Sequence, residues 1–392
     1  MRTALTLSVF LLLNSFVSAQ TKWFEGTWQE AFAQAQKENK YLFIDCYTDW
    51  CGWCKVADKN TFPAEDVAAV LNENFVSVKV DMERGEGVML GARYRVLGYP
   101  GYLLFTPKGK LAGKMFGYEE NPSDFAAQVK AALNESDQPN YPSLITDKVE
   151  FPEFYLNSFT NMDKEEKRQN PKEDEVEKWL SAQSDLMDEA AWSVIYKFPV
   201  SEKYTDQFLE NRKAYANLYG KVEVDEKISG IAFGMLQKAM KSQNEADLQL
   251  VLDFADKYIE KELDAAKSMY HLKFCEGKGD WSGYAACVQK LIDHYGFENF
   301  LSGINDYSWT IYLSVDNKEV IETALAWMKR VVELDPQYMF LDTYAALLFK
   351  SGEIDAALEW ADKAIEVGKA NGEKVNDTEH LRNQIKAAKE GK

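Results

Sequence analysis

Short runs of β-branched and aromatic residues alternate with helical patterns in the first third of the chain. The runs have the length of strands and are bounded by turn residues, and they predict strands at 41–47, 75–81, 102–106 and 111–116. Apolar positions at helical spacing predict helices at 27–39, 51–60, 64–72, 88–94 and 121–133. Strands that alternate with helices and end in a hairpin predict an α/β domain with a mixed sheet over residues 20–134.

The character of the chain changes after residue 134. Residues 135–152 are rich in Asn, Ser, Asp and Pro, which indicates a linker. Beyond the linker, helical periodicity continues without convincing strand runs at 175–186, 229–240, 245–261 and 265–274. We therefore expect an all-α domain over residues 153–392.

The end of this helical region resembles a tetratricopeptide repeat. The clearest part is 322–368, where Gly352 falls at an interhelix turn and Ala356, Ala357 and Ala364 fall at close-packing positions. Paired helices approach closely where side chains are small, so these alanines have a packing reason. The resemblance implies a stack of helical repeats that could dock a protein partner.

Residues 1–19 have the pattern of a secretory signal peptide. A basic start is followed by an apolar run from Ala4 to Leu13 and by small residues before Gln20. The apolar run is too short for a permanent membrane-spanning helix, and the alternative of a buried N-terminal helix would lack a polar face. We expect an exported protein, periplasmic or extracellular, without stable membrane insertion once the signal is removed.

Composition limits the remaining possibilities. The chain has 392 residues and is 46% hydrophobic, which is enough for two domains with cores of their own. Its formal net charge of −18 argues against nucleic acid or an anionic membrane as a partner. Five cysteines are too few for a disulfide scaffold, and their odd number leaves at least one thiol unpaired.

The most informative stretch is Trp-Cys-Gly-Trp-Cys at 50–54, directly after an expected strand. Two cysteines at this spacing form a redox pair when the first lies at a helix start, because unpaired amides and the helix dipole favour the thiolate. Zinc sites use the same spacing, but they need a second ligand pair, and the three histidines lie far downstream. The pattern therefore favours a redox-active disulfide, without metal or other cofactor, over zinc; an inert disulfide at a bend is the other alternative.

This stretch resembles the thioredoxin superfamily, and within it the secreted members of the Cys-Gly-Trp-Cys type. Trp50 before the first cysteine, Asp45 six residues ahead of it and Gly-Tyr-Pro-Gly at 98–101 all match the family. The resemblance implies a protein thiol-disulfide oxidoreductase in which Cys51 is the nucleophile and Cys54 resolves the mixed disulfide. It also implies that Asp45 exchanges a proton with Cys54; a hydrogen-bonded core acid is the alternative reading.

Further residues are expected around the pair. The resemblance implies a cis peptide at Pro100, which would leave the backbone of Tyr99 free to pair with an extended client segment. An ordinary loop proline is the alternative. Gly52, Trp50 and Trp53 would surround the dithiol and contact the client, although the two tryptophans are equally consistent with plain surface.

The other cysteines and one lysine complete the set of candidates. Cys46 is expected to point into the core as a small hydrophobic residue. Cys275 and Cys287 flank a turn between two expected helices, where they are either buried thiols or a disulfide. Lys79 on the neighbouring strand is a candidate partner of Asp45.

An exported reductase or isomerase of protein disulfides fits these observations best. The Gly52-Trp53 pair contains no histidine that would make the dithiol an extreme oxidant. Its partners would be client proteins with disulfides or cysteines and an electron donor, membrane-bound or soluble. The alternative is an interaction or redox-sensing module, in which the helical repeats bind a partner and the thioredoxin-like domain is structural.

Overall fold

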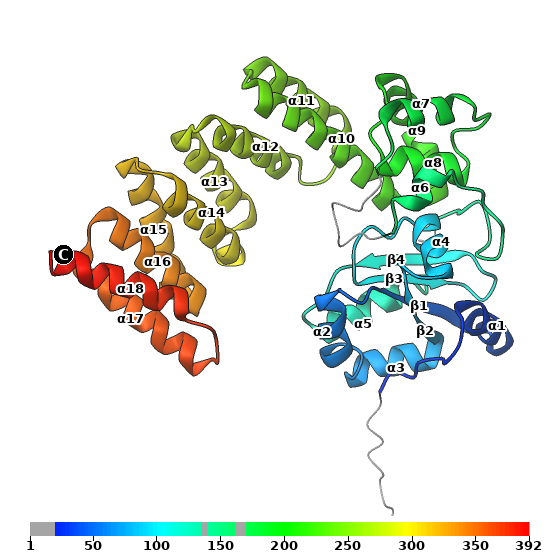
Figure 1. The fold of residues 1–392 in the computed structure, drawn as a ribbon, viewed down its shortest axis with the longest axis horizontal. Helices are drawn as coiled ribbons and strands as arrows, with labels where there is room; N and C mark the ends of the chain where they lie inside the picture. The colour runs from blue at the N-terminus through cyan, green and yellow to red at the C-terminus, as the bar shows by residue number, and fades with distance from the viewer. Residues whose placement is uncertain (1–19, 135–138, 161–169, 392) are drawn as a thin grey trace, which may run out of the picture. The chain divides into compact units, whose positions relative to one another are not determined.

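The computed structural model describes residues 20–134, 139–160 and 170–391. The expected signal peptide at 1–19 lies outside these residues. The chain divides into two compact units, residues 1–224 and 225–392. The predicted order, an α/β domain followed by helices, is confirmed along the ribbon of Figure 1. No helix of the described ranges is both long and apolar enough to cross a membrane.

Unit 1 is built on a four-stranded mixed sheet with the order β2-β1-β3-β4. Strand β1 (Tyr41–Tyr47) runs parallel to β2 (Phe75–Asp81) and antiparallel to β3 (Gly101–Phe105), and β3 pairs with the antiparallel β4 (Leu111–Phe116). These are the predicted strands, with β3 displaced by one residue. Because β1 has a neighbour on each side and is buried along its middle five residues, it gives the segment that follows it a rigid base.

Helices cover both faces of this sheet, as Figure 1 shows for α2 and α3 on one side and α4 on the other. Their bounds are α1 Trp28–Glu38, α2 Gly52–Asn60, α3 Glu65–Asn74, α4 Glu86–Arg93 and α5 Pro122–Ala131. The predicted capping box of Thr27 and Glu30 begins α1, and Pro122 occupies the first turn of α5. Phe43 of β1 packs with Phe62, Tyr102 and Phe125 in an aromatic core between the sheet, α2, α3 and α5.

Residues beyond the expected linker also belong to unit 1. They form α6 (Glu153–Asn157), α7 (Glu173–Ser181), α8 (Glu189–Lys197), α9 (Glu202–Tyr219) and the first turn of α10 (Lys221–Ser242). The sequence assigns these residues to the helical domain, whereas α6 and α8 pack on α4. The described part of the expected linker also contacts the α/β domain, since the amide of Ile145 donates to the carbonyl of Gly109 at 2.9 Å.

Two buried arginines explain why these helices join the sheet. Arg93 donates to Glu189 at 2.6 Å, and Arg95 donates to the two carboxylate oxygens of Glu223 at 2.9 and 3.1 Å. Lys114 of β4 pairs with the same carboxylate. Burial by itself would raise the pKa of Glu223, but the positive charges of Arg95 and Lys114 have the larger effect and lower it to about 2. Arg95 has φ 53°, a left-handed conformation that costs energy outside glycine and that these contacts stabilise.

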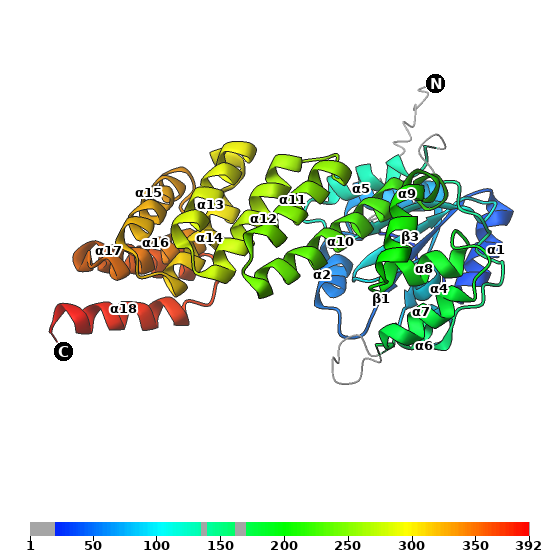
Figure 2. The same ribbon diagram turned by 90° about the horizontal axis from the view of Figure 1, so that it is seen from above.

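The described residues of unit 2 form helices throughout. They are the rest of α10, α11 (Glu245–Tyr258), α12 (Leu263–Lys278), α13 (Trp281–Tyr295), a 3-10 turn (Phe297–Asn299), α14 (Leu301–Ser314), α15 (Lys318–Leu334), α16 (Tyr338–Ser351), α17 (Ile354–Ala370) and α18 (Asn376–Lys389). Successive helices lie side by side (Figure 2). Gly352 ends α16 in the left-handed conformation, and Ala357 and Ala364 of α17 are fully buried, whereas Ala356 is only partly covered. The assignment of residues 322–368 as a tetratricopeptide-like repeat stays a prediction.

Candidate functional site

The dithiol lies where β1 ends and α2 begins. Cys51 is the N-cap of α2, and its sulfur accepts a hydrogen bond from the amide of Cys54 at 3.0 Å. The two cysteines are joined in a disulfide, with an S–S distance of 2.03 Å and a Cα–Cα distance of 5.4 Å. The structure thus places the first cysteine at a helix start, where the free amides and the helix dipole favour a thiolate once the bond is reduced.

The disulfide itself is largely covered. Cys51 retains 3% of its surface and Cys54 5%. The residues beside it are exposed instead: Gly52 meets no neighbouring atom, and Trp50 and Trp53 expose 44% and 60% of their surfaces. The tryptophans next to each cysteine in the chain are therefore far more exposed than the cysteines themselves.

The expected proline loop contacts the segment that carries the dithiol. The Tyr99-Pro100 peptide is cis, and Pro100 directly precedes β3. The ring of Tyr99 meets the ring of Trp50 edge to face, with 5.8 Å between the centroids. Since Trp50 adjoins Cys51 in the chain, the backbone of the proline loop and the dithiol share one surface.

Asp45 is buried in β1 with 2% of its surface exposed. It lies opposite Lys79 of β2, whose ammonium group donates to Asp45 Oδ2 at 2.5 Å, so the suggested pairing is present. The other oxygen, Oδ1, has no hydrogen-bond partner among the described residues. Burial raises the pKa of Asp45 to about 6, because it outweighs the attraction of Lys79.

Lys79 also links Asp45 to the helix of the dithiol. Its ammonium group donates to Asp58 of α2 as well as to Asp45, and it lies 4.3 Å from the centroid of the Trp23 ring. Asp58 is four residues after Cys54, so the two share one face of α2. Lys79 therefore connects Asp45 to the helix that carries Cys54.

Three contributors to the site were missed from the sequence. Asp58 could have been found by helical spacing from Cys54. Tyr118 stacks on Trp53 with 5.3 Å between the ring centroids, and Glu83 accepts from the indole N–H of Trp50 at 3.1 Å. Neither of the last two stands in a local pattern with its tryptophan, because each comes from a loop that only the folded sheet brings near.

The remaining three cysteines do not take part in a disulfide. Cys46 is fully buried in β1, as expected, and burial keeps the pKa of its thiol well above the usual range. Cys275 and Cys287 are free thiols, partly and almost fully buried respectively. Among the residues that the structure describes, no cluster of three or more His, Cys, Asp or Glu side chains is arranged to hold a metal ion.

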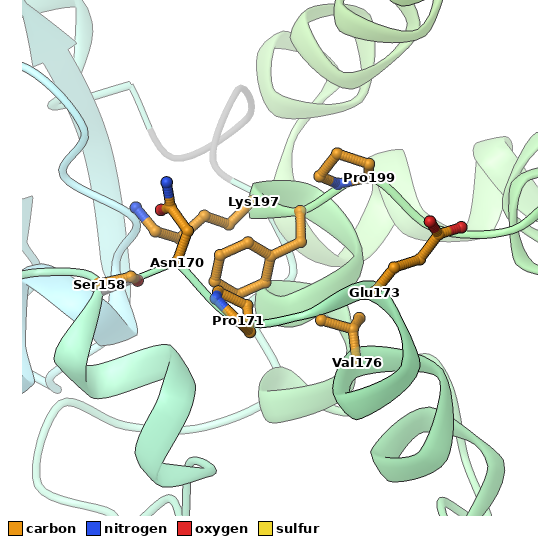
Figure 3. A pocket seen from close by; sticks show the side chains of 8 residues that line it. Ser158, Asn170, Pro171, Glu173, Val176, Lys197 and Pro199 are labelled. Atoms are coloured by element: carbon orange, nitrogen blue, oxygen red, sulfur yellow. The ribbon is translucent and has the colours of Figure 1, made fainter. Parts of the chain in front are cut away.

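A separate pocket of unit 1 is shown in Figure 3. It has a volume of about 460 Å³ and is lined by Ser158, Asn170, Pro171, Glu173, Val176, Lys197, Phe198 and Pro199. These residues flank α6, α7 and α8. None of the residues expected at the dithiol lines this pocket.

Comparison with known proteins finds a matching family model and several similar proteins. A family model named Thioredox_DsbH, with the description "Protein of unknown function, DUF255", matches residues 5–89. Spermatogenesis-associated protein 20 of Rattus norvegicus is 47% identical over 55 residues, which are 14% of this chain and 7% of that protein. The thiol:disulfide interchange protein DsbD of Pseudoalteromonas atlantica is 31% identical over 108 residues, 27% of this chain and 18% of that protein.

A solved structure is also similar to a part of the chain. It is the solution structure of a Bacteroides thetaiotaomicron protein that is 37% identical and covers 30% of this chain and 95% of its own, with a TM-score of 0.28. The chain spans less than a fifth of the length of the two curated relatives named above.

Proposed function

The N-terminal part of this chain is a thioredoxin-like domain, and we propose that it acts as an exported protein thiol-disulfide oxidoreductase. The observation that carries the proposal is the Cys51–Cys54 disulfide at the start of α2, beside the cis Tyr99-Pro100 peptide. An inert structural disulfide would not need a buried acid with a raised pKa in the preceding strand or exposed aromatic side chains next to each cysteine. Both are present here.

The exchange reaction follows from this geometry. In the reduced protein, the Cys51 thiolate attacks one sulfur of a client disulfide, forms a new S–S bond with it, and releases the other client sulfur as a thiolate that takes up a proton. Cys54 then loses its proton and attacks the Cys51 sulfur. The Cys51–Cys54 disulfide forms, and the client leaves as a dithiol. Two electrons have passed to the client, so a donor must reduce the pair again.

Asp45 is the proton acceptor for the second step. A general base works best when its pKa lies near the working pH, and burial raises the pKa of Asp45 to about 6. The oxygen Oδ1 is free of other hydrogen bonds among the described residues, while Lys79 holds Oδ2. Lys79 also donates to Asp58 of α2, the helix that carries Cys54.

The surface around the dithiol suits an extended protein segment. Trp50 and Trp53 offer exposed aromatic faces, and Leu97 and Phe116 add exposed apolar surface near the proline loop and at the end of β4. The cis Tyr99-Pro100 peptide supports a role of the proline loop in client binding. We take the clients to be exported proteins with disulfides or cysteines, and not nucleic acid. The donor is a membrane-bound or soluble reductant, and the helical region docks client or donor.

The test is reduction of insulin disulfides by the purified mature protein. Cys51→Ser should abolish turnover, and Cys54→Ser should trap a mixed disulfide between Cys51 and insulin, detectable on non-reducing gels. Cys275→Ser, which removes a free thiol of unit 2, is the matched control and should leave the rate unchanged. Normal turnover by Cys51→Ser would overturn the proposal. Fractionation of the producing cells tests export separately.

A further inference from the structure

A second pair of thiols lies in unit 2, and the oxidoreductase chemistry does not use it. Cys275 belongs to α12 and Cys287 to α13, and these helices pack on each other as a hairpin. Gly279 makes the turn with φ 71°, in the left-handed region that glycine tolerates. Both thiols are free in the structure, and both belong to one hydrophobic cluster, with Cys287 in its buried part and Cys275 packed against it.

The close approach of Cys275 to α13 depends on a glycine. A Cβ atom on Gly283 would lie 2.9 Å from the Cys275 sulfur, so a larger residue there would require the sulfur to move. Gly283 is four residues before Cys287, so both face the same side of α13. Cys275 therefore lies against the face of α13 that also carries Cys287. Asp280, the N-cap of α13, accepts a weak hydrogen bond from the Cys275 thiol at 3.8 Å.

We propose that Cys275 and Cys287 are a second disulfide site, which a low-molecular-weight disulfide such as oxidised glutathione closes. The two thiols differ in access, because Cys275 is partly exposed whereas Cys287 retains 6% of its surface. The oxidant therefore reaches Cys275 first. The cross-link would join α12 to α13 and tie the hairpin together.

The reaction balances with the oxidant as the electron acceptor. Cys275 loses its proton, attacks one glutathione sulfur and forms a mixed disulfide, and the first glutathione leaves as a thiolate that takes up a proton. Cys287 then loses its proton and attacks the Cys275 sulfur, so that the second glutathione leaves as a thiol. Two cysteine thiols have become one disulfide, and one glutathione disulfide has become two thiols.

The surroundings set the speed of this reaction and the lifetime of its product. Burial, together with Cys287 and Asp280, raises the pKa of Cys275 to about 11, and burial raises the pKa of Cys287 as well. The thiolate is therefore scarce at neutral pH, so closure should be slow and should accelerate as the pH rises. Thiols of high pKa are poor leaving groups, so the closed bond should resist reduction. Those properties suit a structural cross-link and differ from those of the catalytic pair.

The experiment uses the full mature chain with Cys51→Ser and Cys54→Ser, so that failure of the proposed function cannot affect it. The protein is incubated with oxidised glutathione at alkaline pH, unfolded, alkylated and mapped by mass spectrometry. Two of the three remaining cysteines should be lost as one disulfide that links the peptides of Cys275 and Cys287. Cys46 should carry the alkyl label and serves as the internal control.

Two further variants test the order of the steps. With Cys287→Ala, a small apolar side chain that suits the buried position, glutathione should accumulate on Cys275 as an unresolved adduct. With Cys275→Ser, Cys287 should remain unmodified, because the oxidant cannot reach it. Circular dichroism confirms the helical content of each variant. The proposal is overturned if both thiols stay free after prolonged incubation with oxidised glutathione at alkaline pH, or if the glutathione adduct on Cys275 persists with Cys287 in place.

Discussion

Replacing Asp45 by Asn should make the protein more stable at neutral pH while it slows disulfide exchange. The substitution keeps the shape of the side chain and removes a charge that is buried in the central strand β1. Lys79 does not lose all its partners, because Asp58 still accepts from it. The cavity and packing terms are therefore small, and the change in stability reports the cost of burying the Asp45 charge.

The magnitude follows from the pKa of Asp45, which burial raises from 3.8 to about 6. Between these pH values the native state holds a proton that the unfolded state has lost. The free energy of unfolding therefore falls as the pH rises from about 4 to about 6, and it is constant above that range. A difference of about 2 pH units at 1.36 kcal/mol each gives about 3 kcal/mol. The attraction of Lys79 is already contained in that value, so Asp45→Asn should gain about 3 kcal/mol at pH 8 and nothing below pH 4.

Cys46 provides a local probe for this measurement. It adjoins Asp45 in β1 and is fully buried, so its thiol reacts only when this domain unfolds. The oxidised full chain is equilibrated in urea at each pH and pulsed with a pyridyl disulfide, which reacts in acid as well as in neutral solution. Labelling of Cys46 is then read by mass spectrometry. The matched control is Asp58→Asn, which removes a half-exposed partner of Lys79 and should change stability by about 1 kcal/mol or less.

The reasoning fails if Asp45→Asn is less stable than the parent chain at pH 8, or if the difference does not vary with pH. A second readout separates stability from chemistry. The variant should resolve the mixed disulfide between Cys51 and a client more slowly than the parent, and most clearly near neutral pH, where the ionised carboxylate of the parent accepts the Cys54 proton. Equal resolution rates would remove Asp45 from the reaction while leaving its effect on stability intact.

Three other substitutions probe the remaining parts of the argument. Glu223→Gln should cost about 3–5 kcal/mol, because it leaves Arg95 buried without its partner charge; urea unfolding checks this, and a neutral result would mean that the network is not stabilising. In the parent chain, the contribution of Glu223 should be lost as the pH falls from about 4.5 to about 2. Trp53→Ala should raise the KM for insulin about tenfold at unchanged kcat, since a tryptophan contact is worth about 1.4 kcal/mol, and an unchanged KM would exclude Trp53 from client binding. Thr27→Ala should cost about 1 kcal/mol of unfolding free energy by removing the cap of α1, unless that helix frays without consequence.

The sequence sufficed wherever a structural feature depends on neighbours in the chain. Cys51 caps α2 and Thr27 caps α1 because each bonds to an amide three residues on. The break between α2 and α3 occurs at Thr61 to Ala64, around the proline that cannot continue a helix. The cis peptide at Pro100 was reached through resemblance to a family, and a single proline in a turn would not have predicted it.

Contacts across the fold were beyond such reasoning. The sequence suggested Lys79 as a partner of Asp45, but its second bond, to Asp58 of α2, depends on how the helix packs on the sheet. The pair of Arg95 and Glu223 is separated by 128 residues, so no local pattern reveals it. A boundary placed by composition alone therefore divides a compact unit that buried charges hold together.

By itself, the sequence of this protein determined the order of strands and helices, the helix start at the dithiol and the chemistry that two close cysteines permit, because these depend on backbone geometry over a few residues. The tertiary structure decided how far the disulfide is covered, which charge lies beneath it, and which helices share a core with the sheet. Those properties depend on the low-dielectric interior that forms when distant segments pack, and desolvation there sets the cost of each charge.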